Sequence, residues 1–229
     1  MKERPILFSG PMVRAILGGQ KTQTRRIAIP KRSYIDFIGG GPKDGPDWND
    51  PACWGFEDPN TGLWWALRGD EQCYQLPCPH GHVGDRLWVR ETWAQPVALD
   101  PGPTVYRADY PACVPKEFEN VPGAAEITWK PSIHMPRLAS RITLEITGVR
   151  VERLQSISEA DAISEGIEVF ETDDPDLQGM WRDYSEDGLA SGNPIGSFLT
   201  LWDGINAARG YGWEANPFVW VLEFRRIER

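Results

Sequence analysis

The alternation of apolar and polar residues from Arg141 to Leu154 constrains the fold of this chain most strongly. Apolar side chains recur at every second position in its first half, at Ile142, Leu144 and Ile146. This period indicates a β-strand with one buried face. Gly148 interrupts the pattern, and we expect a bulge or a bend there. The segment from Phe218 to Ile227 is apolar on both faces at its start, which is typical of a central or barrel-closing strand.

Short helices and further strands lie around these two segments. We expect strands at Pro5–Phe8 and Arg86–Trp93, and helices between Ser9 and Gly18, at Ser158–Gly166 and at Gly196–Ala208. Loop-rich insertions separate them at about residues 30–79, 95–131 and 168–194. The first is expected to hold a small hairpin at Leu63–Leu67, and the second a short strand at Val105–Arg107. These elements predict a mixed α+β chain, built as one domain of residues 1–229 around a small β-barrel.

The charge of the chain limits its partners. A net charge of −9 argues against sequence-independent binding of long nucleic acids, because such binding needs clustered Lys and Arg. The charge is uneven, however: residues 1–35 hold eight basic side chains and one acid, whereas residues 159–187 hold eleven acids and one base. This asymmetry leaves room for a local site for an anionic ligand. Two solvated faces of opposite sign would produce the same pattern.

The composition also indicates a compartment. No stretch approaches the ~20 consecutive apolar residues of a membrane span, and the N-terminal apolar run is too short for a secretory signal. Four Cys in 229 residues are too few for a disulfide scaffold. We therefore expect a cytoplasmic protein with reduced thiols.

Several motifs occur in a characteristic order. A helix leads into GGQKTQTRR, a Gly-Asp turn opens the strand GDRLWVRETW, and the long strand ITLEITGVRVERLQSIS precedes SEADAISEGI and a C-terminal strand. WKPSIHMP lies between the second and the third of these motifs. This order resembles the ASCH branch of the PUA-like superfamily, and in particular the longer ASCH proteins of bacteriophages and prophages. The resemblance covers about half of the chain, in separate blocks.

The resemblance implies a PUA-like barrel (ASCH) with short flanking helices and long loop insertions, and it also implies a chemistry. Small relatives are amidohydrolases that remove the acetyl group from N4-acetylcytidine. By this resemblance Lys21 would accept a proton, Thr24 would be the nucleophile, and Glu165 would donate a proton to the leaving nitrogen. Other members of the family are ribonucleases or RNA-associated modules, so the family does not define the reaction.

The residues themselves allow this chemistry without requiring it. Acyl transfer needs a nucleophile and a base within hydrogen-bond reach, and a hydroxyl paired with a lysine is one form of that pair. Lys21 acts as a base only if burial or a nearby cation lowers its pKa, and Arg25 and Arg26 are candidate neighbours that could also bind a phosphate. A solvated turn at Lys21–Arg26 and an ordinary acid at Glu165 are the alternatives.

Further candidates for substrate binding lie on a strand and in a loop. Alternation places Glu91 on the inward face, where it needs a cationic partner such as Arg141. We expect Arg90, Glu91 and Trp93 to line the pocket. Ser132 and His134 lie in a loop without acids and could recognise a phosphate or a base edge, although His134 could equally bind backbone.

Neither a metal nor a cofactor is predicted. Candidate ligands occur at Cys73, Cys78, His80 and His82, with Cys53 and Cys113 elsewhere, but they lack the tight CxxC pairs of structural zinc sites. No P-loop, GxGxxG, HExxH or GxSxG motif occurs.

Three functions follow from this sequence. The first is a hydrolase that acts on a modified cytidine or a related N-acylated base. The second is a binding module for a flipped or single-stranded base of RNA or DNA, and the third is an ASCH-type ribonuclease. The expected partner is a modified nucleoside or a single-stranded nucleic acid, without a membrane.

Overall fold

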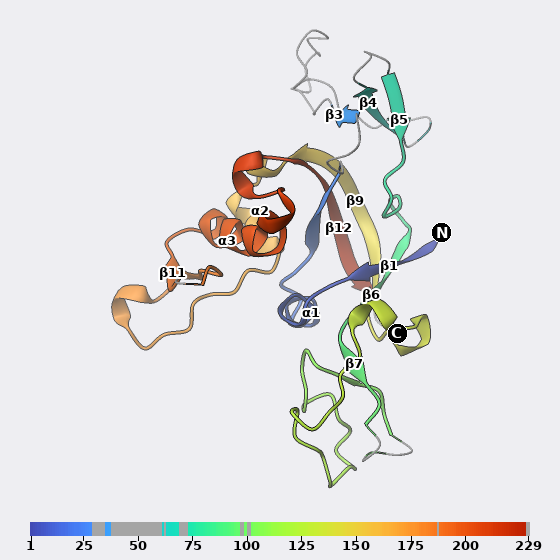
Figure 1. Cartoon of the computed structure of the whole chain (residues 1–229), viewed down its shortest axis with the longest axis vertical. Helices are drawn as coiled ribbons and strands as arrows, with labels where there is room; N and C mark the ends of the chain where they lie inside the picture. Colours follow the sequence, from blue (N-terminus) through green and yellow to red (C-terminus); the bar gives the residue numbers. More distant parts are fainter. Residues whose placement is uncertain are drawn as a thin grey trace.

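The computed structural model describes residues 1–28, 35–37, 61, 63–68, 73–96, 99, 102–186 and 188–227. Its centre is a five-stranded mixed sheet with the strand order β1-β6-β9-β12-β2 (Figure 1). These strands span, in that order, Glu3–Leu7, Arg86–Arg90, Thr143–Arg153, Phe218–Ile227 and Gln23–Ile27. β1 runs parallel to β6, and the other neighbouring strands are antiparallel.

The expectation of a small β-barrel is wrong. Within the described residues β1 pairs only with β6 and β2 pairs only with β12, so the two edges of the sheet are not joined. A closed barrel would require a hydrogen-bonded neighbour on both sides of every strand. The chain instead passes from β1 to β2 through the helix α1 (Gly10–Leu17). The fold is therefore a mixed α/β arrangement around an open sheet.

Different helices cover the two faces of the sheet. On β12, Trp220 and Leu222 belong to one core cluster, whereas Val219 and Val221 belong to the other. Residues of α1 join the first cluster, and residues of α2 (Glu159–Ser164) and α3 (Pro194–Asn206) join the second. Figure 1 shows α2 and α3 together on one side of the sheet. Burial on both faces explains why β12 is apolar throughout its first half.

The longest strand pair contains the expected irregularity. β9 and β12 pair along their whole length, with a register shift that places Gly148 opposite Glu223 and Ile146 opposite Phe224. One residue of β9 is therefore left without a partner, which is a β-bulge. A Cβ atom at position 148 would lie 2.6 Å from a carboxylate oxygen of Glu223, so a larger residue there would displace the end of that side chain.

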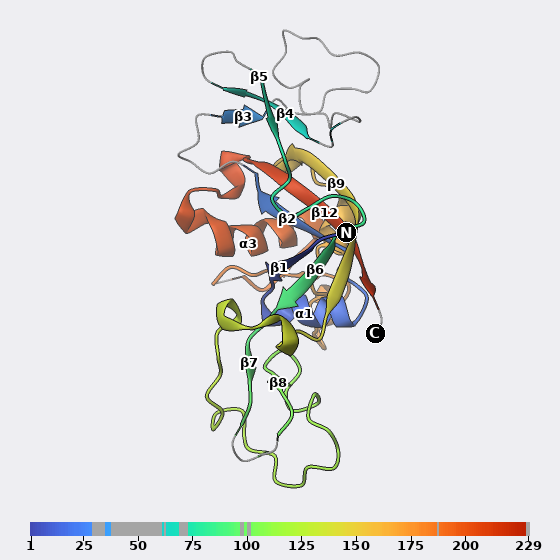
Figure 2. The same cartoon turned by 90° about the vertical axis from the view of Figure 1, so that its right-hand side faces the viewer.

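The insertions contain small sheets of their own. The first holds β3 (Ile35–Phe37), β4 (Trp64–Arg68) and β5 (Cys73–Leu76), so the hairpin expected at Leu63–Leu67 is one strand of a three-stranded sheet. The second pairs β7 (Trp93–Ala94) with β8 (Val105–Tyr106), and the third pairs β10 (Trp181–Arg182) with β11 (Ala190–Ser191). Figures 1 and 2 show the first two projecting from opposite ends of the main sheet.

Capping residues determine where the helices around the site begin and end. The Ser158 hydroxyl accepts a hydrogen bond from the Asp161 amide at the start of α2, and the Asn193 side chain accepts one from the Gly196 amide at the start of α3. Glu165 is the C-terminal cap of α2, and Gly166 follows it with a φ of +83°. Among the helices of the described segments, none is long and apolar enough to cross a membrane.

Candidate functional site

A pocket of about 270 Å³ lies beside β2, an edge strand of the main sheet. Figures 1 and 2 both show α3 next to this strand. Alternate residues of β2 face opposite sides of the sheet, and the pocket reaches around the edge to contact both sets. Its polar wall includes Thr24, Arg25, Arg26, His80, Glu165 and Arg209. Its apolar wall includes Met12 of α1 and Phe198, Leu201 and Trp202 of α3.

Lys21 and Glu165 form a buried ion pair beside this pocket. Lys21 Nζ donates hydrogen bonds to the carboxylate of Glu165 at 2.8 Å and to its backbone carbonyl at 2.5 Å. The two residues are 2 % and 3 % exposed, respectively. The alternative interpretation of residues 21–26 as a solvated turn is therefore wrong.

Burial changes the proton affinity of Lys21. Desolvation lowers the pKa of its amine below the ordinary value, while the carboxylate of Glu165 opposes the change. The cations Arg25 and Arg26 lower the lysine pKa further. An amine with a lowered pKa is a better proton acceptor near neutral pH than a solvated lysine is.

Thr24 faces the same pocket as Glu165. It lies on β2 opposite Leu222 and is 2 % exposed. Within the described part of the chain no hydrogen bond engages the Thr24 hydroxyl. Lys21 does not line the pocket and lies behind Glu165. Thr24 and Glu165 are therefore the residues of this group that a ligand would meet, and the Lys21 amine contacts Glu165.

The two neighbouring arginines have different surroundings. Arg25 forms ion pairs with Glu152 at 2.5 Å, Asp161 at 3.4 Å and Glu165 at 3.2 Å, so its charge is compensated within the protein. Arg26 instead donates from Nη2 to the carbonyl of Leu7 at 2.7 Å. Its Nε is buried without a hydrogen-bond partner in the described structure. Burial lowers the pKa of Arg26 as well.

His80 is a pocket residue that the sequence did not identify as one. Its sequence neighbours suggested a metal ligand, whereas the structure places its ring on the wall of the pocket. Burial, followed by the charges of Arg26 and Arg4, lowers the pKa of His80 to about 4. The imidazole is therefore neutral at physiological pH and can both donate and accept a hydrogen bond.

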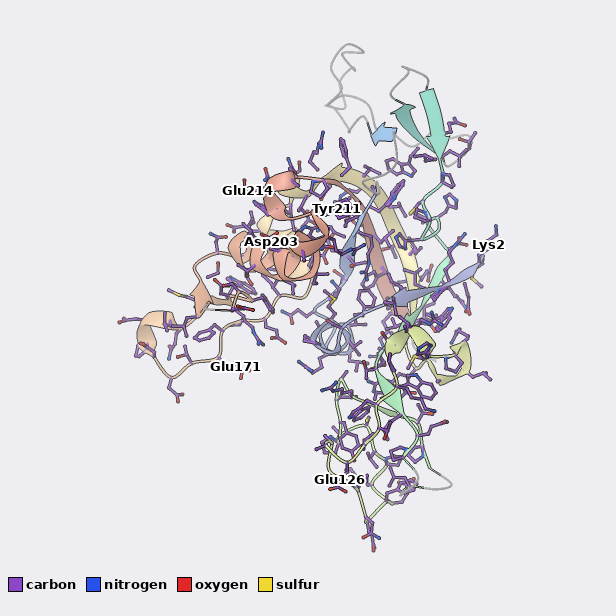
Figure 3. All side chains as sticks on the ribbon, viewed as in Figure 1. Lys2, Glu126, Glu171, Asp203, Tyr211 and Glu214 are labelled. Carbon is purple, nitrogen blue, oxygen red and sulfur yellow. The ribbon has the colours of Figure 1, made fainter. Side chains whose placement is uncertain are left out.

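The residues contributed by α3 were also missed. A helix was expected there, but nothing in its sequence distinguished Phe198 and Trp202, or Arg209 in the turn after the helix, from ordinary core and surface positions. Figure 3 labels Asp203 and Tyr211, which lie on either side of Arg209 in the chain. The indole of Trp202 donates to the Tyr211 carbonyl, and Asp203 accepts from the Trp213 amide, which fixes this end of the helix.

Glu91 has the partner that its inward position requires. It is 1 % exposed and accepts two hydrogen bonds from Arg141, both at 2.9 Å. Arg141 also binds Asp109 and stacks on the ring of Tyr106 at 4.0 Å. Burial raises the pKa of Glu91. The cluster links a core strand to the second insertion and does not line the pocket.

The remaining predicted binding residues also lie away from the pocket. Arg90 donates to the Met135 carbonyl and stacks on Trp88, and Trp93 is buried beneath the Lys130 amine. Ser132 and His134 lie in a 3₁₀ turn. None of them lines the pocket beside β2, and a substrate-binding role for them stays a prediction.

The described residues contain no group of three or more His, Cys, Asp or Glu side chains that could hold a metal. Cys78 is buried in the core. The side chain of Cys73 and all of Cys53 lie outside the described residues.

A larger and more open hollow of about 770 Å³ lies along the third insertion. Two pairs of its polar side chains bind each other: Arg182 binds Glu168, and the Ser185 hydroxyl binds Asp183. Because the buried polar groups gather at the smaller pocket, that pocket is the stronger candidate site.

No family model matches the sequence, and neither a curated protein nor a solved structure matches it. The resemblance to ASCH proteins therefore rests on the sequence motifs alone.

Proposed function

We propose that the chain is an ASCH-type cytoplasmic protein that binds a cytosine-like base beside β2 and hydrolyses an N-acyl group from it. In a phage or prophage setting the compartment would be the cytoplasm of the host cell. One observation carries the proposal: Thr24 and Glu165 share a pocket, and the carboxylate of Glu165 is bonded to the buried amine of Lys21. A hydroxyl, a carboxylate and an amine with a lowered pKa are the groups that acyl transfer uses.

In the first step Thr24 Oγ1 attacks the acyl carbonyl carbon. The hydroxyl proton passes to the Lys21–Glu165 pair. The group of the pair that accepts it is the carboxylate of Glu165, because Glu165 lines the pocket. The carbon–nitrogen bond then breaks, and the same pair returns the proton to the leaving exocyclic nitrogen. Water hydrolyses the acyl-threonine, which releases the acid and restores the hydroxyl.

The shape of the pocket suits a small planar ligand. Its volume of about 270 Å³ lies just below the roughly 300–1,000 Å³ that is typical of small-molecule sites. Apolar side chains of α1 and α3 provide its walls, and the neutral ring of His80 adds a donor and an acceptor for a base edge. A ligand with a flat apolar face and a polar rim matches this lining.

A non-enzymatic binding module is the second candidate. Both oxygens of the Glu165 carboxylate already accept hydrogen bonds, one from Lys21 and the other from Arg25. A carboxylate held in this way is a rigid hydrogen-bond acceptor for an amino group, which would serve recognition without turnover.

The decisive experiment incubates the purified chain with N4-acetylcytidine and, separately, with labelled RNA and DNA. Release of cytidine and acetate supports the hydrolase, a stoichiometric complex without product supports the binding module, and strand cleavage supports the ribonuclease. Thr24→Val keeps the shape of the side chain and should lower turnover by about a thousandfold or more. Thr22→Val is the matched control, because Thr22 is exposed on the same segment. Equal loss in both variants would reject Thr24 as the nucleophile.

A further inference from the structure

The pocket beside β2 contains two cations that the protein does not neutralise. Arg26 and Arg209 both line it, and neither forms an ion pair within the described structure. Arg25, on the same wall, contrasts with them because three carboxylates surround it. On a chain with a net charge of −9, two such arginines at one cavity are unusual.

Arg26 has hydrogen-bonding capacity to spare. A guanidinium has five N–H donors, and that of Arg26 engages the Leu7 carbonyl through Nη2 while its Nε is buried without a partner. The charge of the Glu165 carboxylate acts on Arg26, but the two oxygens of that carboxylate accept hydrogen bonds from Lys21 and Arg25. A buried donor without a partner favours a ligand that supplies an acceptor.

Arg209 stands at the exposed end of the same pocket. It closes a 3₁₀ turn, Ala207–Arg209, which follows α3 and ends at Gly210 with a φ of +78°. The nearby acid Asp203 accepts a hydrogen bond from the Trp213 amide at 2.6 Å and does not pair with the arginine. The guanidinium of Arg209 is therefore available to an anion.

We propose that the natural ligand is a nucleotide, with Arg26 and Arg209 binding its phosphate while the base occupies the pocket. Arginine pairs recognise phosphate through charge-assisted hydrogen bonds. The neutral state of His80 leaves these two side chains as the uncompensated charges of the pocket wall. The inference rests on the proposed function for the position of the base and adds that a neutral nucleoside is the poorer ligand. The phosphate could belong to a free mononucleotide or to a strand.

The test measures binding by calorimetry with the full chain and four probes: cytidine, cytidine 5′-monophosphate, cytidine 3′-monophosphate and a short oligocytidylate. At least one phosphorylated probe should bind about tenfold or more tightly than cytidine, and added salt should reduce this advantage. Preference for a monophosphate indicates a free nucleotide, and preference for the oligonucleotide alone indicates a strand.

Arg209→Gln should remove most of the advantage, and Arg107→Gln should retain it. Arg107 is the matched control because it is exposed, forms no ion pair in the described residues, and lies outside the pocket. Equal binding of cytidine and every phosphorylated probe overturns the inference, as does an unchanged preference in Arg209→Gln or a failure of all four probes to bind.

The outcomes also separate this inference from the proposed reaction. Turnover of N4-acetylcytidine without any preference for phosphate would keep the hydrolase and overturn the nucleotide. Arginine-dependent binding of a phosphorylated probe without turnover would support the nucleotide and exclude the hydrolase.

Discussion

The amine of Lys21 binds both the carboxylate and the backbone carbonyl of Glu165, a residue 144 positions later in the chain. This pair joins the segment after α1 to the end of α2. It also places one oxygen of Glu165 beside Arg25, so that the carboxylate lies between two cations. The stability of the fold and the chemistry of the pocket therefore depend on the same contact.

Removing either partner of this pair should destabilise the protein. Glu165→Gln leaves Lys21 buried without its carboxylate, while Arg25 keeps Glu152 and Asp161, and should lower the free energy of unfolding by about 3–5 kcal/mol. Lys21→Met should cost less, because Arg25 still pairs with Glu165. Urea unfolding of both variants and of the double variant measures the coupling. The loss of stability in the double variant should be smaller than the sum of the losses in the two single variants. A loss equal to that sum would show that the contact between Lys21 and Glu165 contributes little.

Gly166 should resist substitution for reasons of space as well as of backbone conformation. A Cβ atom there would lie 2.8 Å from Cβ of Ala15 and 2.9 Å from Cβ of Lys21. Gly179 has a similar φ of +78° and nothing within 4 Å, so Gly179→Ala reports the backbone strain alone. We expect a loss of about 1 kcal/mol for Gly179→Ala and of about 2–4 kcal/mol for Gly166→Ala, measured by urea unfolding. Similar losses in both would mean that the neighbours of Gly166 move aside easily.

Arg141 should be more important for stability than a surface arginine. Arg141→Met leaves Glu91 buried without a partner, which should cost about 3–5 kcal/mol or force the carboxylate to take up a proton. Arg225→Gln breaks the exposed pair with Glu145 and should cost at most about 1 kcal/mol. Thermal unfolding of both variants tests the difference. Because Arg141 also binds Asp109, proteolysis of the second insertion should accelerate in Arg141→Met alone.

Asp85 should make the free energy of unfolding depend on pH in the acidic range. Hydrogen bonds from the Lys2 amide and the Arg4 guanidinium lower the pKa of its carboxyl to about 2. The pKa of Asp85 is lower in the folded state than in the unfolded state. The stabilisation that Asp85 contributes is therefore complete above pH ~4 and is lost as the pH falls toward ~2. Solvent contact limits it to about 1 kcal/mol.

Asp85→Asn should therefore be less stable than the wild type at pH 7, and the difference should shrink at pH 3. Asp173→Asn, at an exposed position, is the control and should show a constant difference. If the difference in free energy of unfolding between the wild type and Asp85→Asn is the same at pH 7 and pH 3, Asp85 is not the source of the pH dependence.

Local patterns predicted the main strands and helices well. The alternation in residues 141–154 corresponds to β9, and the expected irregularity at Gly148 is present as a bulge. The segment Phe218–Ile227 is a strand with these bounds, β12. The helix expected from Gly196 begins at Pro194, because Asn193 caps it and a proline is favourable in the first turn.

The barrel could not be predicted correctly from the same patterns. Apolar alternation reports which face of a strand is buried, and that face looks the same in an open sheet and in a closed one. Closure depends on whether the edge strands β1 and β2 pair with each other, which the alternation within either strand does not report. The pocket shows a related limit: Thr24 and Glu165, which the motifs singled out, are among its lining residues, whereas His80 and Arg209 reach it through tertiary packing alone.

Arg26 spans the two edges of the open sheet, because its side chain leaves β2 and binds the carbonyl of Leu7 at the end of β1. The gap that a barrel would seal with a series of backbone hydrogen bonds is bridged here by a guanidinium group. Breaking one such charge-assisted hydrogen bond costs about 1.5–3 kcal/mol, less than separating two strands joined by several hydrogen bonds. A ligand that draws Arg26 away from Leu7 would therefore break this contact between the two edge strands while the hydrogen bonds of all the paired strands remain.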